Sequence, residues 1–558
     1  MDHNRKKLLR KPAGWLRLRT VIGPWPEPGR IILTLAAGMV LLCTGCAVGP
    51  DYVRPPTAAP EAYKEDVGWK VAQPRDELPK GAWWEIYNDR QLNELVRQVD
   101  ITNQNIAAAE ANFRQALALI RVARAAYFPT VIGTPSWSRF KRSENLGNSN
   151  TNFAGSSGTG SGGGGGIGSF PGATLSDYLL NFNGTWEPDI WGKVRRSVES
   201  SKASAEASAS TLEGVRLSAQ ALLAQSYFQL RALDEQKRLL DEIARAFQTI
   251  LDRTKNRYTS GVAARNDIAL AETQLKNTQA QAVDLGVQRA QLEHAIATLI
   301  GKPASVFSIP PAKVALTIPA IPAGVPAELL ERRPDIAAAE RNMAAANAQI
   351  GVALAAYYPN ITLSATGGFE ASTAAKWFAW PSRFWSLGAA AAQTIFDGGL
   401  RSGQTAAARA AYDSTVAAYR QTVLTAFQEV EDNLAALRIL EEEAKVQDEA
   451  VRAARLSVTL STNQYQTGTI STLDLLVVVT VARNNENTAV TILGNRLTAS
   501  VLLIKALGGG WKESDLPSVE SWLLPPAKTP PAAEPPGQPE GAANPPTAEG
   551  SPGEPSTR

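Results

Sequence analysis

Cysteine is almost absent from this chain of 558 residues, and the only two, Cys43 and Cys46, lie close together near the N-terminus. If the chain is cut just before Cys46, the mature protein keeps one thiol and folds without an internal disulfide. Its stability must therefore come from packing.

Histidine is equally scarce, with only His3 and His294. This excludes a zinc site or a catalytic triad that needs several histidines. His294 lies in a helical pattern and reads as an ordinary helix residue. No GxSxG nucleophile motif is present either, so an envelope hydrolase, one of the alternatives, is disfavoured. We expect no catalytic residue, no metal site and no cofactor.

Beyond the N-terminal region, the sequence has no run of 18 apolar residues, so a membrane crossing would have to use β-strands. The formal charge of +3 is also misleading, because residues 1–45 hold eight basic and two acidic residues. Their removal leaves a net negative chain. We therefore expect no nucleic-acid partner.

The N-terminal region is basic and then apolar. A largely apolar stretch from Ile31 to Cys43 is too short to span a bilayer and reads as a cleavable signal peptide. It leads into Thr44-Gly45-Cys46, which resembles the lipobox of bacterial lipoproteins, although Cys43 stands where Leu is commoner. Cys46 is thus the candidate lipidation site. The alternative is a plain secretory signal that leaves Cys46 as a free thiol.

The chain contains an internal duplication. Residues 105–112 (NIAAAEAN) match 335–342 (DIAAAERN), and 125–129 (AAYFP) match 355–359 (AAYYP), at a constant offset of 230. A later pair, in which Tyr258 corresponds to Tyr465, matches at an offset of 207. We therefore expect one supersecondary unit to occur twice.

Each unit is predicted to run helix, two strands, two helices. The first copy begins with a helix over 90–127 that ends before Pro129. Alternation of apolar and polar residues predicts strands at about 130–141, 180–187, 361–366 and 384–396, although Pro135 weakens the first. Strands of this length can cross a membrane when tilted. The alternative is a small soluble sheet.

Very long helices follow the strands, at about 190–256 and 399–463. Each would extend on the order of 100 Å. Short breaks at Gly261 and Gly468 precede returning helices over 267–300 and 473–507. The sequence therefore predicts two long antiparallel helical hairpins.

Two segments of low complexity lie outside this plan. Residues 155–168 contain nine glycines and read as a flexible loop between strands, without the GxxxxGK[ST] motif of a nucleotide site. Residues 525–558 contain 11 prolines and read as a disordered tail.

Four signatures in order resemble the TolC-like outer-membrane factors, in their NodT/OprM-type lipoprotein branch. They are Cys46 with Val48-Gly49-Pro50-Asp51-Tyr52, then Trp83-Trp84, then 330–336 (LERRPDI), and 507–511 (LGGGW). The resemblance covers residues 46 to about 515. It implies an α+β membrane protein that forms a homotrimer, with a shared outer-membrane β-barrel of four strands per protomer and a long periplasmic α-helical barrel.

The resemblance also implies location and partners. The protein would be lipid-anchored in the cell outer membrane, extend into the periplasm, and work with a periplasmic adaptor and an inner-membrane pump of the resistance-nodulation-division (RND) class. It would serve as the passive exit duct of a tripartite efflux system. Alternatives are a periplasmic adaptor lipoprotein, or an outer-membrane channel for metal efflux or type I secretion.

In the family the periplasmic end of the tunnel closes near the hairpin tips. The gate candidates that follow are Tyr465, Gly468, Thr469, Thr472 and Asp474, with hairpin-turn equivalents Tyr258, Gly261 and Asp267. Both glycines also suit a plain helix–turn–helix corner, and Asp474 could simply cap its helix. Val477 stands where many relatives have an acid, so the usual acidic ring is in question.

These patterns divide the chain into consecutive segments. We expect a signal peptide at 1–45, a lipid-anchored segment at 46–89, a first repeat at 90–310, a linker at 311–333, a second repeat at 334–515 and the Pro-rich tail at 516–558.

Overall fold

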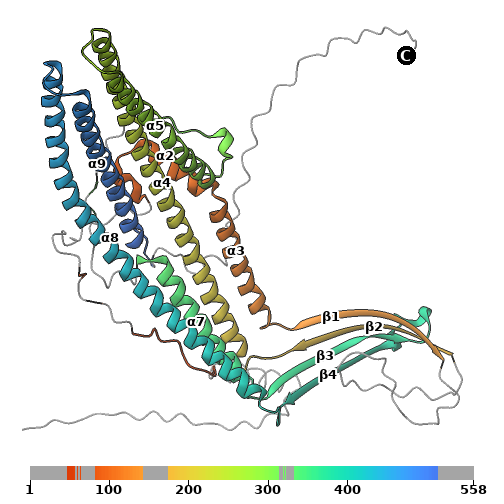
Figure 1. Cartoon of the computed structure of the whole chain (residues 1–558). Coiled ribbons are helices and arrows are strands. Elements are labelled where there is room, and N and C mark those ends of the chain that lie inside the picture. The colour runs from red at the N-terminus through yellow and green to blue at the C-terminus, as the bar shows by residue number, and fades with distance from the viewer. Residues whose placement is uncertain are drawn as a thin grey trace, which may run out of the picture.

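The computed structural model describes residues 47–56, 60, 63–64, 82–141, 174–312, 318–319, 321, 332–512 and 514. Two long helices run from a four-stranded sheet at one end of the molecule toward two hairpin tips at the other (Figure 1). Shorter helices pack along them. The signal peptide, Cys46, the Gly-rich segment 155–168 and the Pro-rich tail lie outside the described residues.

The same order of elements occurs twice, with nearly equal lengths. Short 3₁₀ helices are η1 (Trp83–Tyr87), η2 (Ala304–Val306), η4 (Ala374–Lys376) and η5 (Trp380–Ser382). The first half contains α2 (Arg90–Thr102), α3 (Gln104–Ala125), β1 (Thr130–Lys141), β2 (Thr174–Trp186), α4 (Lys193–Thr259) and α5 (Arg265–Leu299). The second half contains α7 (Pro334–Ala355), β3 (Asn360–Ala371), β4 (Arg383–Ala392), α8 (Leu400–Gln466) and α9 (Thr472–Ala506). Helices α4 and α8 both have 67 residues, and α5 and α9 both have 35.

The expectation of one helix over 90–127 is wrong, because Asn103 divides it. The Asn103 backbone is extended, and its side-chain oxygen accepts hydrogen bonds from the backbone N–H groups of Asn105 and Ile106, at 2.9 and 3.2 Å. This is an N-cap for α3. The Asn103 amide also donates to the carbonyl of Leu299 at 2.7 Å, which fixes the junction against the end of α5.

The four expected strands are present and form one antiparallel sheet in the order β1-β2-β3-β4. Among the described residues, β1 and β4 are edge strands. Pro135 lies in β1, which pairs with β2 alone within one chain, and the register of the two strands continues through it. The sheet therefore has two open edges.

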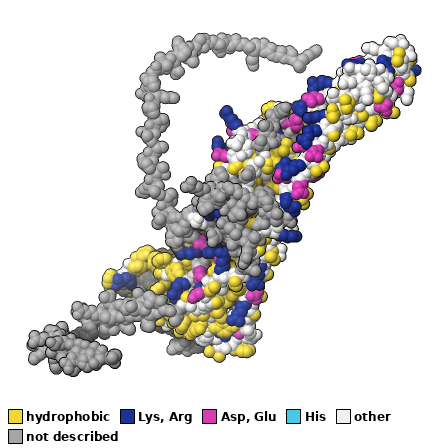
Figure 2. Space-filling model, turned by 90° about the vertical axis from the view of Figure 1, so that its left-hand side faces the viewer, with side chains coloured by type: hydrophobic (Ala, Val, Ile, Leu, Met, Phe, Trp, Pro, Cys, Tyr) yellow, Lys and Arg dark blue, Asp and Glu magenta, His cyan; other side chains and the backbone are white. Residues whose placement is uncertain are grey.

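The main core lies midway along the helices, where η1 and α2 pack on α4 and on the last turns of α5 and α9. Trp83 and Tyr227 are among its largest fully buried side chains. Hydrophobic side chains gather at the end that carries the sheet, whereas charged side chains of both signs are spread along the helices (Figure 2). Ala-rich faces let α4 pack closely on α7.

One helix in the described part of the chain, α9, is long and apolar enough to span a membrane by length and composition alone. An uninterrupted run of 18 apolar residues is still absent from α9, because residues such as Arg483 and Asn484 interrupt it. Half of its apolar stretch is buried, and α9 lies beside α8 and α4 (Figure 1). Its hydrophobicity is explained by packing.

Candidate functional site

A strap formed by the described residues between 47 and 64 runs along the helices from the sheet to the main core, in which Tyr63 is buried. The Val48 N–H donates to the carbonyl of Trp191 at 3.1 Å. Further along, the Tyr52 hydroxyl donates to Glu340 Oε1 at 2.6 Å, and Arg54 Nε donates to the hydroxyl of Tyr419 at 3.2 Å. The strap thus joins helices from both halves.

Arg196 on α4 is the central anchor of the strap. Its side chain is 6% exposed, and its guanidinium donates to the carbonyl of Gly49 at 3.2 Å and to Asp51 Oδ1 at 2.8 Å. Gly49 has a φ of +110°, and a Cβ there would lie 2.5 Å from the Cα of Gly351. The glycine in the Val48-Gly49-Pro50-Asp51-Tyr52 signature is therefore required by close approach to α7.

The start of the strap marks the junction between sheet and helices. Ala47 packs against Gly192, which immediately precedes α4, since a Cβ on Gly192 would lie 2.8 Å from the Cα of Ala47. Close by, Trp191 stacks on Tyr358 with ring centroids 4.8 Å apart. The chain therefore enters the described structure from Cys46 at the level where the strands end.

Arg333 and Pro334 of the 330–336 signature form a clasp among the helices of the second half. Arg333 is 8% exposed in its side chain and donates to Glu429 on α8 at 2.7 Å, to Asp335 at 2.6 Å, and to the carbonyl of Ala506 at 3.0 Å. Pro334 follows at the first position of α7, where its missing N–H costs nothing. The clasp holds the start of α7 against the end of α9.

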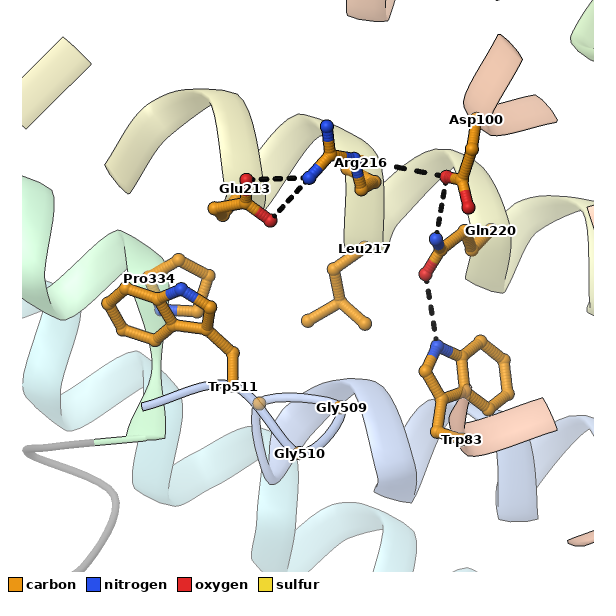
Figure 3. Close-up of a pocket in the computed structure, with 11 residues that line it drawn as sticks. Trp83, Asp100, Glu213, Arg216, Leu217, Gln220, Pro334, Gly509, Gly510 and Trp511 are labelled. Atoms are coloured by element: carbon orange, nitrogen blue, oxygen red, sulfur yellow. Dashed lines mark hydrogen bonds and ion pairs between the residues drawn. The ribbon is translucent and has the colours of Figure 1, made fainter. Parts of the chain in front are cut away.

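The Trp83 and 507–511 signatures meet at a small pocket of about 320 Å³ (Figure 3). The Trp83 indole N–H donates to Gln220 Oε1 at 3.1 Å, and the Gln220 amide donates to Asp100 at 2.8 Å. Gly508 has a φ of +89°, and a Cβ there would lie 1.9 Å from the carbonyl oxygen of Arg332. Burial raises the pKa of the Asp100 carboxyl. These contacts give the two signatures a structural role.

At the hairpin tips the two glycines form the corners. Gly261 and Gly468 have φ values of +75° and +77°, and apart from their chain neighbours no described residue lies within 4 Å of a Cβ built at either. Only the backbone conformation requires glycine there.

The acids that follow the corners cap the returning helices. Asp474 Oδ2 accepts from the backbone N–H and the hydroxyl of Ser471, at 3.0 and 2.7 Å, and the Ser471 hydroxyl accepts from the Asp474 N–H at 3.2 Å. This is a complete capping box. Asp267 makes half of one, because Ala264 has no hydroxyl and only its N–H donates, at 3.0 Å. The capping role considered for Asp474 is thus observed.

Electrostatics at Asp474 follow from these bonds. The hydrogen bond from the Ser471 hydroxyl, followed by that from its backbone N–H, lowers the pKa of the exposed Asp474 carboxyl. It is therefore ionised at neutral pH. Thr469 and Val477 are also exposed near this tip.

The two tyrosines of the duplication have different environments. Tyr465 is 4% exposed, and its hydroxyl lies 3.3 Å from Thr254 Oγ1 and 3.4 Å from Thr472 Oγ1. Thr472 is buried as well. Tyr258, in contrast, is 45% exposed. Of the five gate candidates, Tyr465 and Thr472 therefore face the protein interior.

Tyr465 belongs to a cluster that joins the two hairpins. Phe247 and Ile250 of α4 pack with Leu475 and Leu476 of α9, and the Arg257 guanidinium lies 5.1 Å from the centre of the Tyr465 ring. Burial raises the pKa of the Tyr465 phenol, but hydrogen bonds with Thr254 and Thr472 and the nearby Arg257 lower it below its ordinary value overall. The tips are therefore packed on one another.

Arg196 could not be identified from the sequence, because no motif distinguishes it from the other polar residues of a long helix. The described residues contain no group of three or more His, Cys, Asp or Glu that could hold a metal ion. His294 is exposed on α5.

Comparisons with known proteins agree with this architecture. The family model described as outer membrane efflux protein matches residues 95–302 and 325–509. The chain is 31% identical over 466 residues to the pyoverdine export outer membrane protein OpmQ of Pseudomonas putida, covering 83% of this chain and 95% of OpmQ. It is 28% identical over 487 residues to the toluene efflux pump outer membrane protein TtgC of Pseudomonas putida, covering 86% and 96%.

The solved structure of the outer-membrane channel OprN is also similar, with a TM-score of 0.75 and 29% identity, covering 84% of this chain and 100% of OprN. These relatives are channel and transport proteins of the outer membrane. The chain therefore belongs to the outer membrane efflux protein family, and it is an outer-membrane exit duct of an efflux system that extends into the periplasm.

Proposed function

We propose that three copies of this chain close one β-barrel in the outer membrane and continue it as a helical tunnel through the periplasm. The two open edges of the sheet carry this proposal. An unpaired strand edge cannot lie in lipid, because its backbone N–H and C=O groups would have no partners. Pairing β1 of one copy with β4 of the next removes every edge.

The two faces of the sheet support a barrel with water inside and lipid outside. One face is mainly polar or small: Thr134, Ser136, Asn181, Asn183, Ser364 and Thr366 share it by register, and the Thr366 hydroxyl donates to Asn183 Oδ1 at 3.2 Å. The opposite face carries exposed apolar side chains: Val131, Trp137, Phe182, Trp385 and Leu387. Such a face is suited to lipid.

The lengths of the strands fit the same role. They have between 10 and 13 residues, and a tilted transmembrane strand needs about 9–11. A soluble sheet would not expose this many large apolar side chains on one face.

We propose that Cys46 is acylated and inserts its lipid beside the barrel. Ala47 lies at the sheet–helix junction, which is the level of the periplasmic membrane surface in this arrangement. Several acyl chains would add roughly 0.8 kcal/mol per buried CH₂. No other cofactor and no catalytic residue is proposed.

The periplasmic gate is proposed at the second hairpin tip. Gly468, Thr469 and Asp474 are exposed there, and in a trimer three copies would face one another, with the like charges of Asp474 repelling. Tyr465 and Thr472 would position the tip from inside. Tyr258, Gly261 and Asp267 form the corresponding corner of the first hairpin.

Efflux exit ducts of this kind take their solutes from other proteins. We propose a periplasmic adaptor and an inner-membrane pump of the RND class as partners. This fits relatives such as TtgC, which is the outer membrane protein of a toluene efflux pump. A role as an adaptor lipoprotein is disfavoured by the duplicated hairpin and the membrane-length strands.

Native mass spectrometry and planar-bilayer recording of the full chain in detergent test the proposal together. A trimer that forms ion-conducting pores is expected. A stable monomer with native helix content and no conductance would contradict it.

A further inference from the structure

Arg483 on α9 is a buried cation that makes no hydrogen bond with the described part of the chain. Its side chain is 7% exposed, and its three guanidinium nitrogens are enclosed with no acceptor among the described residues. The nearest carboxylate oxygen, Glu486 Oε2, lies 3.9 Å from Nη1. This is beyond hydrogen-bonding distance.

The carboxylate nearest to Arg483, that of Glu486, binds another arginine. Glu486 Oε1 accepts from Arg455 Nε of α8 at 2.6 Å. On the α4 side, the charges that act on Arg483 are those of Glu242 and Arg238, which pair with each other. Burial lowers the pKa of the Arg483 guanidinium to about 10. The group is therefore surrounded by charges that are already paired.

Other buried arginines of this chain are bonded. Arg231, 1% exposed in its side chain, donates to Asp234 at 2.9 Å and to the carbonyl of Pro310 at 3.0 Å. Arg333 and Arg196 each reach backbone carbonyls and carboxylates. The fold can therefore supply hydrogen-bond acceptors to a buried guanidinium, and Arg483 differs from these arginines in having none among the described residues.

A buried guanidinium without hydrogen bonds disfavours the packing that encloses it, because water would solvate the group if the packing opened. Arg483 lies where α9 packs on α4, eight residues from Leu475, or about 12 Å along the helix. Leu475 belongs to the cluster that holds the two tips together.

We propose that Arg483 is a release device that weakens the packing of α9 against α4, so that the second hairpin can separate from the first. Its effect on transport rests on the gate proposed at the hairpin tips. The weakened packing itself does not depend on that gate.

Hydrogen exchange of the full chain in nanodiscs tests the packing. Arg483→Met, which fills the site with a flexible apolar side chain, should slow amide exchange in α9 around position 483 by about tenfold, since apolar replacement of a poorly paired buried charge commonly stabilises. Arg452→Met on α8, where the side chain is 72% exposed, is the matched control and should leave exchange unchanged. Equal or faster exchange in Arg483→Met would overturn the proposal.

A double-mutant cycle controls for the possibility that the methionine packs poorly at position 483. Glu486→Gln removes the nearest opposite charge and should speed exchange, and this effect should be much smaller when Arg483 is already Met. Equal effects in both backgrounds would overturn the proposal.

Bilayer recording distinguishes the effect of Arg483 on helix packing from the effect of that packing on the proposed gate. Slower exchange with reduced conductance in Arg483→Met is expected. Slower exchange with unchanged conductance would support the release device and count against the gate at the tips.

Discussion

Arg196→Met should free the strap from the helices while leaving the helices folded. Methionine keeps most of the aliphatic stem that packs beside Gly351 but removes every donor. The lost bonds to the strap are those to the carbonyls of Val48, at 3.4 Å, and Gly49, at 3.2 Å, and to Asp51, at 2.8 Å.

The expected magnitude follows from these contacts. A hydrogen bond from a charged donor contributes about 1.5–3 kcal/mol, but the one to Val48 is long, and Asp51 is 93% exposed, so its ion pair adds at most about 1 kcal/mol. We therefore expect the strap to lose about 2–3 kcal/mol of local stability. This corresponds to roughly 30- to 150-fold faster amide exchange if the strap opens locally.

The assay is hydrogen exchange at the Val48 amide, which donates to Trp191 in the intact strap. Arg195→Met is the matched control: Arg195 is 35% exposed and faces Asp189 at 3.5 Å. It should leave exchange at Val48 unchanged. If Arg196→Met changes the exchange rate at Val48 less than threefold, Arg196 is not the anchor.

Further predictions concern the corners and the tip. Gly508→Ala should lower the free energy of unfolding by more than about 2 kcal/mol, because its Cβ would meet a carbonyl oxygen at 1.9 Å. Gly468→Ala should lower it by only about 1–2 kcal/mol, through backbone strain. Equal denaturation midpoints of the two variants would contradict this. Tyr465→Phe should cost about 1 kcal/mol, since its hydroxyl is buried between two threonines, and Tyr258→Phe should be neutral in the same thermal melts. Because the pKa of Asp474 is lowered on folding, its stabilising effect should be complete above the ordinary value of 3.8 and vanish as the pH falls through the lowered pKa. The difference in melting temperature between wild type and Asp474→Asn should therefore be constant above pH 3.8 and shrink as the pH falls below that value; a difference that stays constant at low pH would exclude this linkage.

The elements were predictable because their signals are local and repeated. Alternation identified β3 despite its small residues, and the glycines at 261 and 468 placed both hairpin corners. The division at Asn103 was missed because asparagine is tolerated within helices, and its contact with the carbonyl of Leu299 at the end of α5 is made by a segment distant in the sequence.

The site was less predictable because it depends on packing between distant segments. Tyr258 and Tyr465 share the Tyr-x-x-Gly motif, yet only Tyr465 is buried, since the cluster from α4 and α9 packs around Tyr465 and not around Tyr258. Likewise, nothing in the sequence near Arg196 or Arg483 indicates that one is fully bonded and the other is not.

Single-channel recording of Thr469→Cys shows whether the chain forms a duct that narrows at the hairpin tips. Acylation of Cys46 would leave the introduced cysteine as the only free thiol of the mature chain. We predict that the protein conducts ions across a planar bilayer and that a bulky charged thiol reagent, added from the side of the helical tips, reduces the conductance. The absence of conducting pores, or a conductance that is unaffected although mass spectrometry shows complete labelling at position 469, would contradict a duct that narrows at the hairpin tips.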